Sequence, residues 1–239
     1  MSAPLWPANA NGRELDLLGF GQCSVDHVCT VEGLPRIGGK QGMLAYEVLP
    51  GGQVATAVLA GTRLGLRGAF VGSTGSDAGA DIALAPLAAA GIDLAGVRRV
   101  PGAATRLAVI LVDRASGERT VFGYRDPRLR LRATDLPAER LAQTRCLLVD
   151  GEDPGAAAAV ARAARAAGTA VVLDVDAGGA ELEPLLAAVD FPIVSRSFAE
   201  SYGGDGSVRT GLARLAAHGP RMAVVTLGEL GCLARAGER

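Results

Sequence analysis

The sequence predicts an α/β protein with a doubly wound, mostly parallel sheet and a second, smaller antiparallel sheet. Apolar residues make up 49% of the 239-residue chain but aromatic residues only 4%, so the core consists of thin aliphatic side chains that suit helices lying on a sheet. Short apolar runs alternate with helical segments, as in β-α-β units with right-handed crossovers. One stretch instead alternates every second residue on both sides of a turn, which is typical of a hairpin.

Apolar runs bounded by Gly, Pro or polar turn residues define the strands of the main sheet. These runs are residues 15–21, 69–72, 146–149, 170–175, 191–194 and 222–226. Most runs are followed by a helical segment, and two of the segments end at Gly65 and Gly91. The helices are predicted at residues 54–64, 78–90, 155–167, 181–188, 198–202 and 208–217.

The smaller sheet is predicted from two separate segments, about residues 25–49 and 97–124. The first contains apolar runs at 25–31 and 44–49, and the second contains runs at 107–112 and 119–123. Ligands in doubly wound sheets bind beyond the carboxyl ends of the strands. A small sheet near that edge would form a lid that excludes water from a reaction. We expect one domain over residues 13–239, preceded by a flexible leader at 1–12.

Charge and cysteine usage exclude several classes of function. The chain has 24 Lys and Arg against 25 Asp and Glu, for a net charge of −1, and lacks the clustered basic residues that nucleic-acid binding requires. Its cysteines form no CxxC pair, which excludes a zinc ribbon and is typical of reduced thiols in a cytosolic protein. No apolar run reaches the ~18 residues that span a bilayer. We expect a cytoplasmic protein with neither a nucleic-acid nor a membrane partner.

Two glycine-rich turns adjoin predicted elements. Gly19 and Gly21 follow a strand, but the next segment is β-like and not helical, which favours a tight turn over dinucleotide binding. Gly51 and Gly52 instead open a helix, where backbone N–H groups can face a ligand. Thr56, one turn into that helix, could face the same ligand, although a glycine-opened helix is also consistent with a simple turn.

Lys40 is the only lysine in the chain, because all other cationic side chains are arginines. Such usage indicates that the position favours a compact ammonium group. Together with Gly39 it is predicted to lie at the base of the lid, where it would contact substrate or phosphate. An exposed loop lysine is the alternative.

A set of motifs spread over about residues 15–233 resembles the ribokinase-like (phosphofructokinase B) sugar kinases. The resemblance depends on Asp26, Gly51, Gly52, Gly65, Gly72, Gly75, Asp77, Gly79, Asp174, Glu200, Thr226, Gly228 and Gly231, in this order along the chain. The pattern is nearest to the sulfofructose kinase and ribokinase branch, which shares the Gly-Lys and the Thr56 where most relatives have Asn. The resemblance implies a three-layer α/β/α fold and ATP-dependent phosphorylation of a sugar hydroxyl under the lid.

On the sugar side, the resemblance implies that Asp26 and Glu152 accept hydrogen bonds from sugar hydroxyls. It also implies that the Gly51-Gly52 backbone and Thr56 contact the sugar. Carboxylates suit this role because they offer only acceptors to clustered hydroxyl donors. Glu152 would repel the sulfonate of a sulfofructose kinase substrate, so we expect an uncharged sugar or polyol. The lids of two subunits could pair to form a homodimer.

On the nucleotide side, the resemblance implies that Ser197 and Glu200 occupy the place of the family's Asn-x-x-Glu. Glu200 would organise Mg²⁺ through water, or, on the simpler interpretation, stabilise the start of a helix. Thr226, Gly228 and Gly231 resemble the turn that lies against ATP, although an ordinary β-turn is the alternative.

The family's catalytic Asp and anion hole come from a Gly-Ala-Gly-Asp motif, which does not occur in residues 1–239. That Asp takes the hydroxyl proton, and the helix N-terminus beside it stabilises charge on the γ-phosphate. We therefore name no catalytic residue, expect the family's Asp base to lie beyond Arg239, and expect the chain to be inactive alone. Two interpretations stay open: a sugar kinase whose C-terminal part is absent from this chain, and a non-catalytic sugar- or nucleotide-binding protein related to such a kinase.

Overall fold

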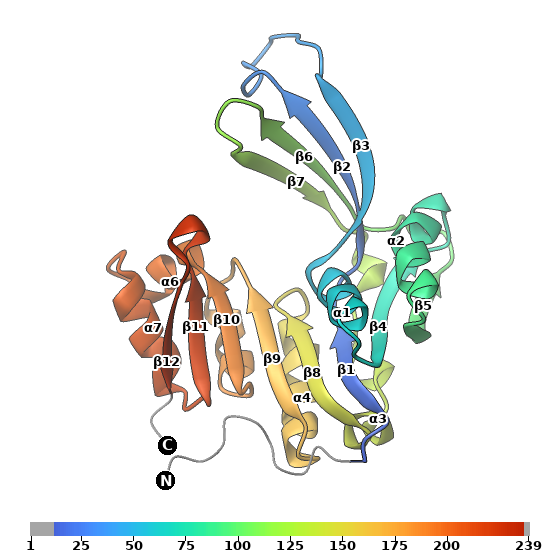
Figure 1. The fold of residues 1–239 in the computed structure, drawn as a ribbon, viewed down its shortest axis with the longest axis vertical. Helices are drawn as coiled ribbons and strands as arrows, with labels where there is room; N and C mark the ends of the chain where they lie inside the picture. Colours follow the sequence, from blue (N-terminus) through green and yellow to red (C-terminus); the bar gives the residue numbers. More distant parts are fainter. Residues whose placement is uncertain (1–11, 237–239) are drawn as a thin grey trace.

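The computed structural model describes residues 12–236, and its larger sheet has eight strands (Figure 1). All neighbouring strands in it are parallel except the last pair, β11 and β12. In spatial order the strands are β12 (Cys232–Ala236), β11 (Met222–Thr226), β10 (Phe191–Ser195), β9 (Ala170–Val175), β8 (Thr144–Asp150), β1 (Leu15–Phe20), β4 (Gly68–Gly75) and β5 (Asp93–Val100). The predicted doubly wound, mostly parallel sheet is confirmed.

Helices cover the main sheet on both sides. They are α1 (Gln53–Arg63), α2 (Ala78–Ala89), α3 (Ala138–Ala142), α4 (Pro154–Ala166), α5 (Glu183–Leu186), α6 (Arg196–Gly203) and α7 (Val208–Ala217). The helix predicted at 181–188 is shorter than expected: a 3₁₀ turn at Ala180–Leu182 precedes the four residues of α5.

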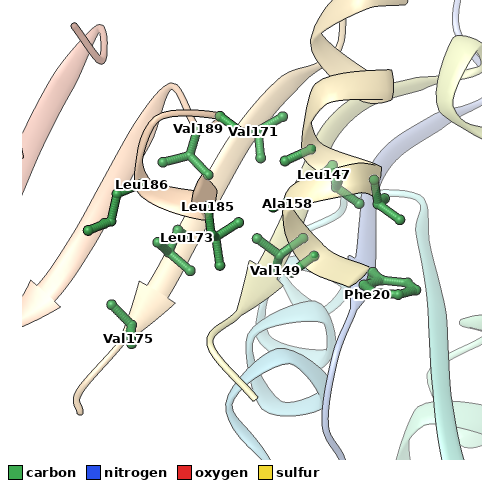
Figure 2. Packing of buried hydrophobic residues seen from close by; sticks show 14 of the residues in the cluster. Phe20, Leu147, Val149, Ala158, Val171, Leu173, Val175, Leu185, Leu186 and Val189 are labelled. Atoms are coloured by element: carbon green, nitrogen blue, oxygen red, sulfur yellow. The ribbon is translucent and has the colours of Figure 1, made fainter. Parts of the chain in front are cut away.

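Successive side chains of β8 point to opposite faces of the sheet and pack in two different cores. Leu147 and Val149 are fully buried against the alanine-rich face of α4, where Ala158 is 1% exposed (Figure 2). Leu148, on the other face, belongs to the core formed with α1 and α2. Small side chains on α4 allow that helix to lie close to the sheet, and a strand buried on both faces requires a continuous apolar run. This explains the three-layer arrangement in a chain with few aromatic residues.

The smaller sheet, which we call the lid, has four strands in the order β3 (Ala45–Gly51), β2 (Ser24–Val31), β6 (Leu107–Asp113) and β7 (Arg119–Tyr124). The outer pairs are antiparallel and the central pair, β2 with β6, is parallel. In Figure 1 the lid rises from the edge of the main sheet at which the parallel strands end.

Two edge strands of the main sheet were not predicted, and one of them corrects the lid boundary. Residues 97–100, assigned to the lid segment that starts at about 97, instead belong to β5 and pair with β4. The segment escaped recognition because Arg98 and Arg99 interrupt its apolar pattern at a half-exposed edge. β12 was missed for the same reason, since four of its five residues are exposed.

Both ends of the chain carry predictions that fall outside the described residues. The leader predicted at residues 1–12 lies outside them, apart from Gly12. Arg239, beyond which the family's Asp base is expected, also lies outside them, so the position of that base stays a prediction. Among residues 12–236 no helix is long and apolar enough to cross a membrane.

Gly211 in α7 provides a test of the helix packing. A Cβ at Gly211 would overlap the carbonyl oxygen of Ala199 in α6, so Gly211→Ala forces two packed helices apart. We expect the free energy of unfolding to fall by about 1–3 kcal/mol, as for other overpacked sites. The matched control is Gly155→Ala in α4, where a Cβ meets nothing within 4 Å and where stability should rise by about 0.4–1 kcal/mol. Urea unfolding measures both, and equal effects of the two substitutions would contradict the packing described here.

Candidate functional site

The strand order reverses next to β1. From β1 the chain proceeds through the lid and α1 to β4 and β5 on one side, and β8 to β12 then extend the sheet on the other side. At such a topological switch point the loops after the two adjacent strands leave in opposite directions and open a crevice. In this protein β1 and β8 are the two adjacent strands, so the crevice is expected beyond their carboxyl ends, on the side of the main sheet from which the lid rises (Figure 1).

A cavity of about 20 Å³ lies at this crevice. Its lining residues come from the loop after β1, from β4, from the roots of the lid and from the turn after β8: Gly21, Gln22, Cys23, Ser73, Arg106, Arg125, Leu129, Leu131, Asp150, Glu152 and Asp153. This volume holds roughly one water molecule. The charged side chains around it are therefore packed mainly against one another.

Asp150, the last residue of β8, joins the two sides of the crevice. It is 3% exposed, and its carboxylate accepts hydrogen bonds from the backbone N–H of Gln22 (2.7 Å) and of Glu152 (3.1 Å). Gly21 lacks a side chain at the place where one would overlap this carboxylate. Burial raises the pKa of Asp150 to about 6, although the two N–H donors lower it. Sequence reasoning missed this residue, because a single Asp at a strand end carries no distinctive pattern.

Glu152 is present at the crevice as predicted, but its carboxylate already has a partner. Arg106 binds it through two parallel hydrogen bonds, from Nη1 to Oε2 (2.6 Å) and from Nη2 to Oε1 (2.9 Å). Arg125 lies 3.7 Å from Oε2 and is itself paired with Asp153. The free carboxylate expected from the sequence is therefore one half of a charge pair, and neither arginine was recognised in advance.

Asp26, Gly51 and Gly52 come together at the root of the lid. The Asp26 carboxylate accepts a hydrogen bond from the Ser24 hydroxyl (2.8 Å) and lies over Gly51, where any Cβ would overlap it. Gly52 adopts a φ of 97°, and a Cβ there would meet the backbone of Cys23. The glycine pair is thus required by close approach and by conformation. Thr56 follows on an exposed position of α1.

Gly39 and Lys40 lie far from this group, which corrects their predicted place at the base of the lid. They belong to the exposed loop 32–44 that joins β2 to β3 at the lid's outer tip (Figure 1). The N–H of Gly39 donates to the carbonyl of Arg36 (2.8 Å), which closes a local turn. The end of β2 matches the predicted run 25–31, but the sequence pattern did not show that the loop after it lies one full strand length away from Asp26.

The residues predicted to bind nucleotide gather at the ends of β10 and β11. Ser195 and Thr226 are directly paired in the sheet, and the Thr226 hydroxyl donates to the carbonyl of Val194 (3.3 Å). The Ser197 hydroxyl lies 3.0 Å from that of Ser195, which caps α6, the helix that carries Glu200. The turn after β11 contains Gly228 (φ 62°) and Gly231 (φ 82°).

The two groups occupy one edge of the sheet but different parts of it. At the usual spacing of about 4.8 Å between neighbouring strands, β11 lies about 14 Å from β8. An elongated ligand or two neighbouring ligands could span this edge. Within residues 12–236 no three His, Cys, Asp or Glu side chains are grouped as ligands for a metal ion, and Glu200 therefore belongs to no such group.

Comparison with known proteins identifies the family. The pfkB family carbohydrate kinase pattern matches residues 15–239. The chain belongs to this family. Its resemblance to the ribokinase-like kinases, stated above from scattered glycine and carboxylate motifs, is thereby confirmed.

Sequence relatives include kinases of different sugars. Fructokinase-1 of Zea mays is 39% identical over 118 residues, which cover 49% of this chain and 35% of the maize protein. The ATP-dependent ribose-1-phosphate kinase of Halopiger xanaduensis is 29% identical over 158 residues, which cover 66% of this chain and 53% of the archaeal protein. The chain thus spans about a third to a half of the length of these curated relatives.

Solved structures share the fold over most of the chain. A candidate ribokinase from Agrobacterium tumefaciens has a TM-score of 0.84 and 30% identity, over 94% of this chain and 74% of the other. A ribokinase from Arabidopsis thaliana, solved with ribose and ATP, has a TM-score of 0.74 and 24% identity, over 94% and 76% of the two chains. The ribokinase-like fold with three layers and a small additional sheet is therefore confirmed.

Asp150 gives the pfkB chain a predictable pH dependence. Because its pKa rises from 3.8 to about 6 on folding, its contribution to stability is complete below pH 3.8 and is lost as the pH rises through 6. The loss amounts to at most about 3 kcal/mol. Asp150→Asn has no such ionisation. From pH 4 to pH 7 the free energy of unfolding of the wild type should therefore fall relative to that of the variant. A constant difference over this range, measured by urea unfolding, would contradict the assignment.

Proposed function

We propose that the chain binds a small, uncharged sugar or polyol in the crevice between β1 and β8, beneath the lid. We further propose ATP binding along the ends of β10 and β11, for phosphorylation of a sugar hydroxyl. The proposal is supported by two observations at the switch point of a pfkB carbohydrate kinase fold: Glu152 lines the cavity there, and Gly52, next to the Asp26–Gly51 contact at the lid root, packs on Cys23 of the same lining.

Each sugar-side group has a chemistry that suits a polyol. Asp26 has one oxygen engaged with Ser24 and offers further acceptor positions to hydroxyl donors. The Asp26 carboxylate lies over Gly51 and the Cys23 backbone lies against Gly52, so a contact of this glycine backbone with the sugar is a proposal that rests on the family resemblance. The exposed Thr56 remains a proposed contact beside them. Gly39 and Lys40, at the lid tip, reach a substrate only if the lid bends toward the sheet, so we give them no role in the proposed pocket.

On the nucleotide side, the proposal assigns the phosphates and ribose of ATP to Ser197, Thr226 and the turn with Gly228 and Gly231. Support comes from the pairing of β10 with β11, which aligns these groups at one edge. Mg²⁺ would enter with the nucleotide and be reached by Glu200 through water, since the described residues offer no direct site.

The transfer step needs a group that residues 1–239 do not contain. The acceptor oxygen attacks the γ-phosphorus, the bond to the β,γ-bridging oxygen breaks, ADP leaves, and the hydroxyl proton passes to a base. The Gly-Ala-Gly-Asp segment implied by the family for that base is absent from the sequence up to Arg239. We therefore infer that this chain binds both ligands without transferring phosphate. A non-catalytic sugar- or nucleotide-binding protein related to such a kinase stays the second candidate function.

A homodimer through the lid also remains a proposal. Four large apolar side chains lie on the lid face opposite Asp26, because side chains alternate along paired strands, and each is at least 37% exposed. They are Tyr46, Val48, Phe122 and Tyr124. Exposed apolar groups clustered on one sheet face are typical of an interaction surface. Sedimentation velocity that shows only a monomer at micromolar concentration would exclude it.

The sugar site is tested by titration of the chain with D-fructose and D-ribose in a calorimeter. Asp26→Asn should weaken binding of the sugar that the wild type accepts by about 10- to 100-fold, the effect of losing a hydrogen bond to a charged acceptor. Asp81→Asn, at a carboxylate on α2 that is 72% exposed, is the matched control and should leave the affinity unchanged. The proposal fails if neither these sugars nor related polyols bind, or if Asp26→Asn binds like the wild type. ADP formation by the chain would refute its inactivity.

A further inference from the structure

Two arginines stand at the roots of the lid strands. Arg106 immediately precedes β6 and Arg125 immediately follows β7, and both side chains reach the turn after β8. They are 20% and 21% exposed, so both are largely removed from solvent. Their guanidinium groups have different hydrogen-bond partners. Arg125 binds the Asp153 carboxylate and the carbonyl oxygens of Glu152 (3.2 Å) and Leu129 (3.4 Å).

Among the hydrogen bonds found in residues 12–236, the guanidinium group of Arg106 donates only to the Glu152 carboxylate. The pair is bidentate, with both nitrogen–oxygen distances at or below 2.9 Å, a geometry that gives strength and fixed orientation. The backbone of Arg106 is fixed as well, because its carbonyl accepts the N–H of Val25 in β2 (2.9 Å). Glu152 is therefore held from the lid side in one orientation, with 32% of its side chain still exposed.

We propose that Arg106 is a specificity-determining positioning residue of the sugar pocket, which orients Glu152 and cancels its charge so that the pocket accepts hydroxyl groups and rejects anionic substituents. This inference rests on the proposed function. It identifies a determinant of substrate class that the motifs do not contain, since Arg106 and Glu152 are 46 positions apart in the sequence.

The remaining hydrogen-bonding capacity of the pair matches a hydroxyl. Each Glu152 oxygen retains a second acceptor position, and Arg106 retains N–H donors beyond the two that it uses. A hydroxyl both donates and accepts, so it can satisfy both partners without separating them. Neutral polyols thus fit the pair as it stands.

The pair does not suit an anionic substituent. Three carboxylates, those of Asp150, Glu152 and Asp153, line the cavity against two guanidinium groups, and both arginines are already paired. To bind an anion, the pocket would have to release a largely buried arginine from its partner. That leaves a carboxylate unpaired, which is strongly unfavourable.

Two substitutions break the same ion pair with opposite changes in charge. Glu152→Gln frees Arg106, and Arg106→Gln leaves the Glu152 carboxylate with only the 3.7 Å contact to Arg125. Because both lose the same contact, a merely structural role predicts similar effects of the two on every ligand. The specificity role predicts that Glu152→Gln gains affinity for D-gluconate, an anionic polyol, by at least about fivefold over the wild type, with the gain reduced at high salt. Arg106→Gln should gain none, and both variants should bind D-fructose more weakly.

Calorimetric titration with D-gluconate and D-fructose decides between these outcomes, with far-UV circular dichroism as a check that each variant is folded. Glu32→Gln, which breaks the exposed lid-tip pair with Arg114, is the matched control and should change neither affinity. The inference is overturned if Glu152→Gln and Arg106→Gln bind gluconate equally, or if neither gains over the wild type. If the wild type binds no neutral sugar but Glu152→Gln still gains affinity for gluconate, the proposed sugar function fails while the charge role of Arg106 stands.

Discussion

The reversal of strand order between β1 and β8 is the constraint on which the rest of the structure depends. Two adjacent parallel strands deliver their following loops in opposite directions, and the resulting opening cannot be filled by regular backbone pairing. Asp150 bridges it, with N–H donors from both sides on one buried carboxylate. Burial raises the pKa of this carboxyl group to about 6, because removal from water disfavours its charged form.

The lid depends on the same opening. At the lid root β2 and β6 begin and β3 and β7 end. The attachment there consists of glycines that permit close packing of the backbone and of arginines that reach the turn after β8. Gly51 and Gly52 allow close packing and, at Gly52, the positive φ, whereas Arg106 and Arg125 form ion pairs with the carboxylates of the turn after β8. A ligand in the crevice would therefore contact the main sheet and the lid together, which is how a lid can respond to what lies beneath it.

The sequence predicted most of the fold because its signals are local. The apolar runs of β8 and β9 and the hairpin of β6 and β7 are recognisable without knowing their partners. β5 and β12 were missed because edge strands need no continuous apolar face. For the site, Asp26 and Gly51 meet at the lid root and Glu152 lines the cavity after β8, while their role in sugar binding stays a prediction. The place of Lys40 was wrong although the end of β2 was predicted correctly, because the pattern does not show which end of the lid adjoins the main sheet. Asp150 and the Arg106–Glu152 pair were beyond sequence reasoning, since their importance follows from contacts across the switch point.

The most direct test of the account is hydrogen exchange, followed by mass spectrometry, of the chain with and without a saturating neutral sugar. If the switch point is the binding site, exchange should slow in segments 19–26, 49–56 and 150–153, which come from three separate parts of the sequence. The lid-tip loop at 32–44 and the α2 helix should be unaffected. Protection confined to the lid tip or to α2, with no change at 150–153, would contradict the central claim.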